Sequence, residues 1–133
     1  METAVLTQVQ AYVRTVVSTG GGIVLEDANW GKMQSGLVVF IDVPPEALSK
    51  RLTAGGEVDG RPVLAGDSSV EAVRALLEDR LPKYEQADVK VRLEGTEALD
   101  DCTKATMDAI QSYIESNPPK WKQWKEKASL PQK

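Results

Sequence analysis

Hydrophobic and polar positions along the chain alternate between helical and strand-like spacing. Apolar residues recur at helical spacing in residues 2–12, 44–52 and 69–84, which predicts helices there, and helices are also expected over residues 26–33 and 100–114. Runs rich in β-branched residues lie between them and predict strands over residues 14–18, 37–43 and 89–93. The second strand is almost unbroken apolar sequence, as in strands covered on both faces. Repeated strand–helix units predict an α/β domain with a parallel sheet.

The first predicted strand runs into three consecutive glycines, Gly20, Gly21 and Gly22. Open α/β sheets bind ligands beyond the carboxyl ends of their strands. Because glycine has no Cβ, backbone amides here can come within hydrogen-bonding distance of a substrate. Glycines alone leave a tight loop without a ligand as the alternative. A second glycine-rich stretch, residues 53–67, has little periodicity and predicts a long functional or mobile loop.

Composition narrows the chemistry. The 133 residues are 41% hydrophobic and 27% charged, which is typical of one globular domain, and neither a membrane-spanning run nor a signal-peptide pattern is expected. With Cys102 as the only cysteine and no histidine, metal sites built on Cys or His and Ser-His or Cys-His nucleophiles are excluded. Oxygen ligands alone favour Mg²⁺. The net charge of −4 argues against nucleic-acid binding.

Four motifs occur in an order and spacing that resemble those of shikimate kinases: Val17-Ser18-Thr19-Gly20-Gly21-Gly22, Asp42-Val43-Pro44, Arg61-Pro62-Val63-Leu64 and Arg80-Leu81-Pro82-Lys83-Tyr84. The resemblance runs from about Glu2 to Leu93. Asn29-Trp30 and the strand of residues 36–43 are most similar to the cyanobacterial and plastid branch. The resemblance implies a P-loop-kinase-like (nucleoside monophosphate kinase-like) α/β domain over residues 1–116, incomplete at its N-terminus.

The resemblance also implies an activity and a set of site residues. Shikimate kinases transfer the γ-phosphate of ATP, with Mg²⁺, to the 3-hydroxyl of shikimate in chorismate and aromatic amino-acid biosynthesis. By this resemblance Gly20, Gly21 and Gly22 offer backbone donors to the shikimate hydroxyls, and Arg80 pairs with the carboxylate. Arg61 matches the catalytic lid arginine that covers the transferred phosphoryl group, and Arg51 matches the arginine that packs against adenine. An ordinary loop arginine at Arg61 and a solvated helix arginine at Arg80 are the alternatives.

The family's phosphate-binding loop, G-x-x-x-x-G-K-[ST], has no match in this sequence. The only Gly-Lys pair, Gly31-Lys32, is followed by Met33. Three interpretations therefore stand: a shikimate kinase that is truncated at its N-terminus, a non-catalytic shikimate-binding or partner-binding relative, and a kinase for another polyol. A plastid stromal location is expected for a photosynthetic eukaryote and a cytoplasmic one otherwise.

The family's sheet has five parallel strands in the order 2-3-1-4-5, and the predicted strands resemble strands 3, 4 and 5. Strand 1, which precedes the phosphate loop, belongs between the first two. We therefore expect either direct pairing of residues 14–18 with residues 37–43 or a gap beside residues 15–18, with a partner or a missing N-terminal segment needed to complete the sheet. Residues 117–133, with interleaved Trp and Lys, predict a basic flexible tail, with a partner-binding or membrane-surface segment as the alternative.

Overall fold

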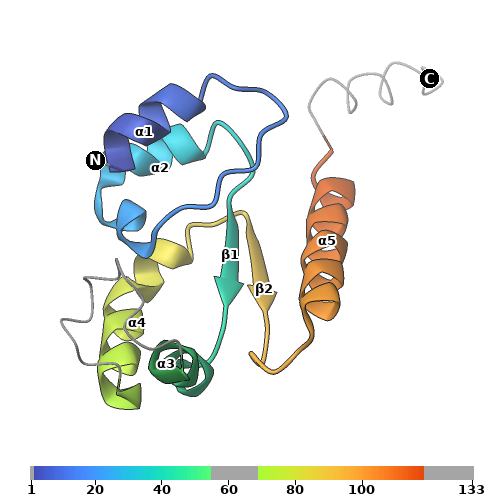
Figure 1. Cartoon of the computed structure of the whole chain (residues 1–133). Coiled ribbons are helices and arrows are strands. Elements are labelled where there is room, and N and C mark those ends of the chain that lie inside the picture. Colours follow the sequence, from blue (N-terminus) through green and yellow to red (C-terminus); the bar gives the residue numbers. More distant parts are fainter. Residues whose placement is uncertain (1, 55–68, 119–133) are drawn as a thin grey trace, which may run out of the picture.

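The computed structural model describes residues 2–54 and 69–118 of the chain (Figure 1). The predicted lid, including Arg61, and the tail beyond Pro118 lie outside the described residues. Helices form in all five segments where they are predicted, and a short 3₁₀ helix follows the glycines. The elements are α1 (Glu2–Val9), η1 (Gly21–Leu25), α2 (Asp27–Met33), β1 (Val39–Asp42), α3 (Pro45–Ala54), α4 (Val70–Tyr84), β2 (Val89–Arg92) and α5 (Leu99–Ser116).

The two strands pair in parallel, with Val39 opposite Val89 and Asp42 opposite Arg92. The Val89 amide donates to the carbonyl of Val38, and the Leu93 amide donates to the carbonyl of Asp42 at 2.9 Å. Successive residues of a strand direct their backbone groups to opposite edges. Because even-numbered residues of β1 face β2, the odd-numbered ones face the other edge, which stays open in the part of the chain that the structure describes.

The predicted strand over residues 14–18 is wrong. This segment is irregular and exposed, with 98% of Val16 accessible to solvent, and it does not pair with β1. A strand is stabilised by the ladder it joins rather than by its own propensity, so β-branched residues without a paired neighbour stay extended and solvated. Direct pairing, one of the two arrangements expected, is therefore absent.

A cavity of about 280 Å³ lies between the end of this segment and β1. Its lining is mostly apolar and includes Trp30, Phe40 and Tyr84, with Thr19, Gly20 and Gly21 on one side. The prediction that β1 is covered on both faces is wrong. Ile41 of β1 lines the cavity and is 51% exposed.

Two hydrophobic clusters hold the described elements together. The first joins α1, η1 and α2 through Leu6, Ile23, Val24 and Trp30. The second packs α5 and α3 against the strands, around Val43, Val89, Val91 and Leu93. Figure 1 shows α5 standing beside β2, with α4 on the far side of the strand pair. None of the helices in residues 2–54 and 69–118 has the length and apolar character needed to cross a membrane.

Candidate substrate site

The glycine turn (residues 20–22) and Arg80 are almost sixty residues apart in sequence and lie side by side in the structure. A Cβ placed on Gly21 would be 3.3 Å from Nη1 of Arg80 and 3.1 Å from the hydroxyl of Tyr84. The approach is made by α4, whose last turns pack against η1. Four of the site residues that the sequence predicts are therefore brought together, and a side chain at position 21 would crowd both the guanidinium and the Tyr84 hydroxyl.

Arg80 is buried rather than solvated. Only 6% of the residue is exposed, and its Nε atom has no hydrogen-bond partner among the described residues. Glu78 and Asp79, its neighbours in sequence, are exposed, and neither forms an ion pair with it in the described part of the chain. A buried cation is costly unless an anion accepts its hydrogen bonds. The interpretation of Arg80 as an ordinary surface arginine is therefore wrong.

Tyr84 also lies at this candidate site, although the sequence alone assigned it no role. Its hydroxyl donates to the carbonyl of Gly21 at 3.3 Å, and its ring stacks on Phe40 of β1 with centroids 4.9 Å apart. The signal was present, because Tyr84 follows Arg80 by four residues and so lies on the same face of α4. Tyr84 fixes the distance between the glycine turn and the helix that carries Arg80.

Glu2 places a carboxylate beside the glycine turn. A Cβ on Gly22 would be 3.3 Å from Oε2 of Glu2, and one on Gly20 would collide with the same carboxylate. Within residues 2–54 and 69–118 the amides of Gly21 and Gly22 have no hydrogen-bond acceptor. The turn thus combines backbone donors with a neighbouring acid and a buried cation, a set of groups suited to a ligand with hydroxyls and a carboxylate.

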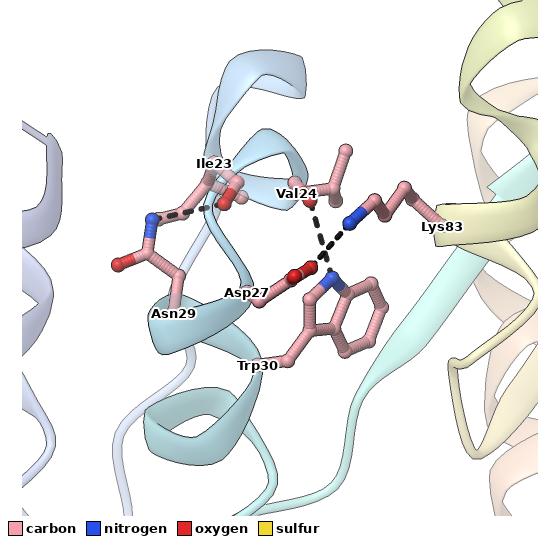
Figure 2. A network of polar contacts seen from close by, with 6 residues as sticks. All are labelled: Ile23, Val24, Asp27, Asn29, Trp30 and Lys83. Carbon is pink, nitrogen blue, oxygen red and sulfur yellow. Dashed lines mark hydrogen bonds and ion pairs between the residues drawn. The ribbon is translucent and has the colours of Figure 1, made fainter.

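An ion pair connects α4, which carries Arg80, to α2, which follows the glycine turn and η1. Lys83 of α4 contacts the carboxylate of Asp27, at the start of α2 (Figure 2). Asp27 is largely exposed, so the pair adds little to stability. Its geometric role is to join α4 to the helix that follows the glycine turn.

Arg51, the predicted adenine contact, lies away from the glycine turn and Arg80. Arg51 donates from Nη2 to the carbonyl of Gly95 at 3.1 Å, which brings it to the loop of residues 93–98. Within this loop, the side-chain carboxylate of Glu97 accepts hydrogen bonds from the backbone amides of Glu94 at 2.6 Å and Gly95 at 2.8 Å. These bonds, that of Glu94 foremost, hold the pKa of Glu97 below its ordinary value. In Figure 1 this loop and the glycine turn lie at opposite ends of β1.

Comparison with known proteins gives one consistent result. The family model for shikimate kinase matches residues 1–111. The chain is 45% identical over 100 residues to the shikimate kinase of Synechococcus sp. (strain RCC307), covering 75% of this chain and 50% of that protein. It is 39% identical over 114 residues to the shikimate kinase of Nostoc sp. (strain PCC 7120), covering 86% and 61%. The chain thus spans about half to three fifths of the length of these curated relatives, and it belongs to the shikimate kinase family.

Proposed function

We propose that this chain binds shikimate at the glycine turn and forms the substrate side of an enzyme that phosphorylates the shikimate 3-hydroxyl with ATP. The single observation that carries the proposal is the buried Arg80 guanidinium, which faces Gly21 and whose Nε has no partner in the described part of the chain. A planar carboxylate satisfies a planar guanidinium through two parallel hydrogen bonds. The membership of the shikimate kinase family supplies a substrate that carries such a carboxylate.

The remaining groups suit the rest of that ligand. The amides of Gly21 and Gly22 can donate to hydroxyl oxygens, while the Glu2 carboxylate can accept from a hydroxyl. Tyr84 holds the Gly21 carbonyl, so the peptide that carries the Gly22 amide has a fixed orientation. Binding by several fixed donors and acceptors orients the acceptor hydroxyl, which is the part of phosphoryl transfer that this half of a kinase can contribute.

ATP and Mg²⁺ belong to the proposed reaction, but the residues present do not fit them. Gly31-Lys32 lies inside α2 and is not a loop that opens a helix. No group of three or more acidic, His or Cys side chains in the described ranges could hold a metal ion. We therefore derive no step through the triphosphate. Arg51 as an adenine contact and Arg61 as the lid arginine are proposals by family, as is a plastid or cytoplasmic location.

The same mismatch favours a second candidate, a shikimate-binding module without kinase activity. In both cases we propose that a further strand completes the sheet, supplied by a partner or by a segment of a longer protein. The open edge of β1 and the apolar cavity beside it support this proposal. The coding DNA upstream of Met1 separates the two candidates: an in-frame Gly-x-x-x-x-Gly-Lys-Ser or Gly-x-x-x-x-Gly-Lys-Thr favours the kinase.

Titration calorimetry with shikimate tests the substrate site. Replacing Arg80 by Ala should weaken binding by on the order of 2 kcal/mol or more, about 30-fold, because it removes the partner of a desolvated carboxylate. The methyl ester of shikimate should bind the parent as weakly as shikimate binds the variant.

Arg74→Ala is the matched control. Arg74 lies on the same helix but is half exposed and paired with Glu46 at 2.5 Å, so its loss should leave shikimate affinity within about twofold. Equal affinity of the parent and Arg80→Ala proteins for shikimate would overturn the proposal.

A further inference from the structure

Two buried side chains of α2 reach back to the 3₁₀ helix that follows the glycine turn. Asn29 donates from Nδ2 to the carbonyl of Ile23 at 2.9 Å, and Trp30 donates from Nε1 to the carbonyl of Val24 at 3.3 Å. Each bond spans six residues, and Figure 2 shows the two donors converging on consecutive carbonyls. They come from adjacent positions of one helix, so a single element makes both bonds.

The burial of these residues indicates that the bonds matter. Asn29 is 1% exposed and Trp30 is 5% exposed. Oδ1 of Asn29 has no partner among the described residues. In this part of the chain, the hydrogen bond to Ile23 is therefore what offsets the cost of burying the Asn29 amide. An apolar residue would fill the same space without leaving a polar atom unpaired. The amide is therefore explained by what it holds rather than by packing.

What it holds is a short helix with little support of its own. η1 spans five residues and has no side-chain cap at its N-terminus. The last carbonyls of a helix lack partners within it. The donors of Asn29 and Trp30 satisfy two of them and fix the carboxyl end of η1. Because η1 begins at Gly21, its other end carries the glycine amides, and fixing one end of so short an element orients the other.

Helix α2 also contacts α4, the helix that carries Arg80. Asp27, at its first position, pairs with Lys83, which lies three residues after Arg80 on α4. Helix α2 thus contacts η1, which begins in the glycine turn, through Asn29 and Trp30, and it contacts α4, which carries Arg80, through Asp27.

We propose that Asn29 and Trp30 are positioning residues for shikimate: they hold η1 so that the glycine amides stay opposite the Arg80 guanidinium. This inference rests on the proposed function and names the residues that make its binding site rigid. It predicts that removing either donor weakens binding even though neither side chain touches the ligand.

The test uses the full chain with Trp30→Phe, which keeps the aromatic packing, and Asn29→Asp, which keeps the size but loses the donor. Each variant should bind shikimate about tenfold more weakly, since a buried carbonyl loses its partner. In hydrogen exchange without ligand, the Ile23 amide, which donates to Gly20, should lose protection in both variants, while amides of β2 should not.

A spectroscopic arm uses the parent with Trp121→Phe and Trp124→Phe, which leaves Trp30 as its only tryptophan. Shikimate should change the emission of Trp30, and Arg80→Ala should abolish this change. The control for general destabilisation is Val91→Ala, which removes a buried side chain from the other hydrophobic cluster and should leave affinity within about twofold.

The outcomes separate the two proposals. If the parent fails to bind shikimate, the proposed function fails, whereas loss of Ile23 protection still shows that Asn29 and Trp30 hold the turn. If the parent binds and both variants bind equally well with unchanged Ile23 protection, the positioning role is overturned. A tenfold loss in Val91→Ala as well would assign the effect to stability and would also overturn it.

Discussion

Replacing Arg80 by Met should have opposite effects on stability and on binding. In the absence of ligand the guanidinium is a buried charge whose Nε has no partner within residues 2–54 and 69–118, and 94% of the residue is out of solvent. Methionine is of similar length and carries no charge. Without ligand, the Arg80→Met protein should therefore be more stable than the parent.

The magnitude follows from the cost of burying ions. Replacing buried ionic groups by apolar ones of similar size is often neutral or stabilising by 1–4 kcal/mol, so we expect a gain of about 1 kcal/mol or more. For a domain of this size that gain raises the melting temperature by about 4 °C. Shikimate at 100 times its dissociation constant should stabilise the parent by about 2.7 kcal/mol, and a variant that binds about 30-fold more weakly by only about 0.9 kcal/mol. The order of the two melting temperatures should therefore reverse when shikimate is added.

Differential scanning fluorimetry with and without shikimate measures both effects. Arg74→Met is the matched control, since that arginine is 48% exposed and its ion pair with Glu46 contributes roughly 0–1 kcal/mol at most. A lower melting temperature for Arg80→Met in the absence of ligand would refute the reasoning, because it would mean that the guanidinium already has a partner in the intact chain.

Three further predictions concern other parts of the molecule. The purified 133-residue chain should form no shikimate-dependent ADP above background in a coupled assay, because its sequence supplies no phosphate-binding loop, and turnover near ~1 per second would contradict this. Gly95→Ala should lower the free energy of unfolding, measured by urea denaturation, by roughly 2–4 kcal/mol, since Gly95 has φ +86° and a Cβ there would lie 2.5 Å from that of Ala47. Gly31→Ala is the control: Gly31 lies in a helix with open space around it, so this change should raise the free energy of unfolding by about 0.5–1 kcal/mol. The lowered pKa of Glu97 means that its contribution to stability is complete above its ordinary pKa of 4.5 and is lost as the pH falls through the lowered value. The amide signals of Glu94 and Gly95 should report that lowered pKa in an NMR titration, and a midpoint at or above 4.5 would contradict the hydrogen bonds seen in the loop.

The elements that were predictable from the sequence are those whose signal is local. The apolar periodicity of α4 and α5 and the compact runs of β1 and β2 depend on residues within the same segment, and all four form close to the expected positions. Helix α4 continues through Pro82 to Tyr84, as the predicted bounds of residues 69–84 require. The α/β class with a parallel pairing followed from the order of these elements.

What the sequence could not predict depends on neighbours that are distant along the chain. Residues 14–18 have a strand-like composition, but a ladder partner decides whether a strand forms. The burial of Arg80 was hidden by the acidic residues beside it, because helix neighbours at i−1 and i−2 point away from the face that Arg80 shares with Tyr84. The motifs predicted which residues gather at the glycine turn, whereas the hydrogen bonds of Asn29 and Trp30 required the turn itself to be seen.

The stacked rings of Phe40 and Tyr84 connect the sheet to the glycine turn. Phe40 belongs to β1, its ring lies within 10° of parallel to that of Tyr84, and the Tyr84 hydroxyl ends on the carbonyl of Gly21. A shift or twist of β1 therefore moves the phenol and, through it, the peptide that presents the Gly22 amide. A strand added at the open edge of β1 would change that twist without touching the ligand. If the proposed shikimate site is correct, its affinity for shikimate would then depend on whether the sheet is complete.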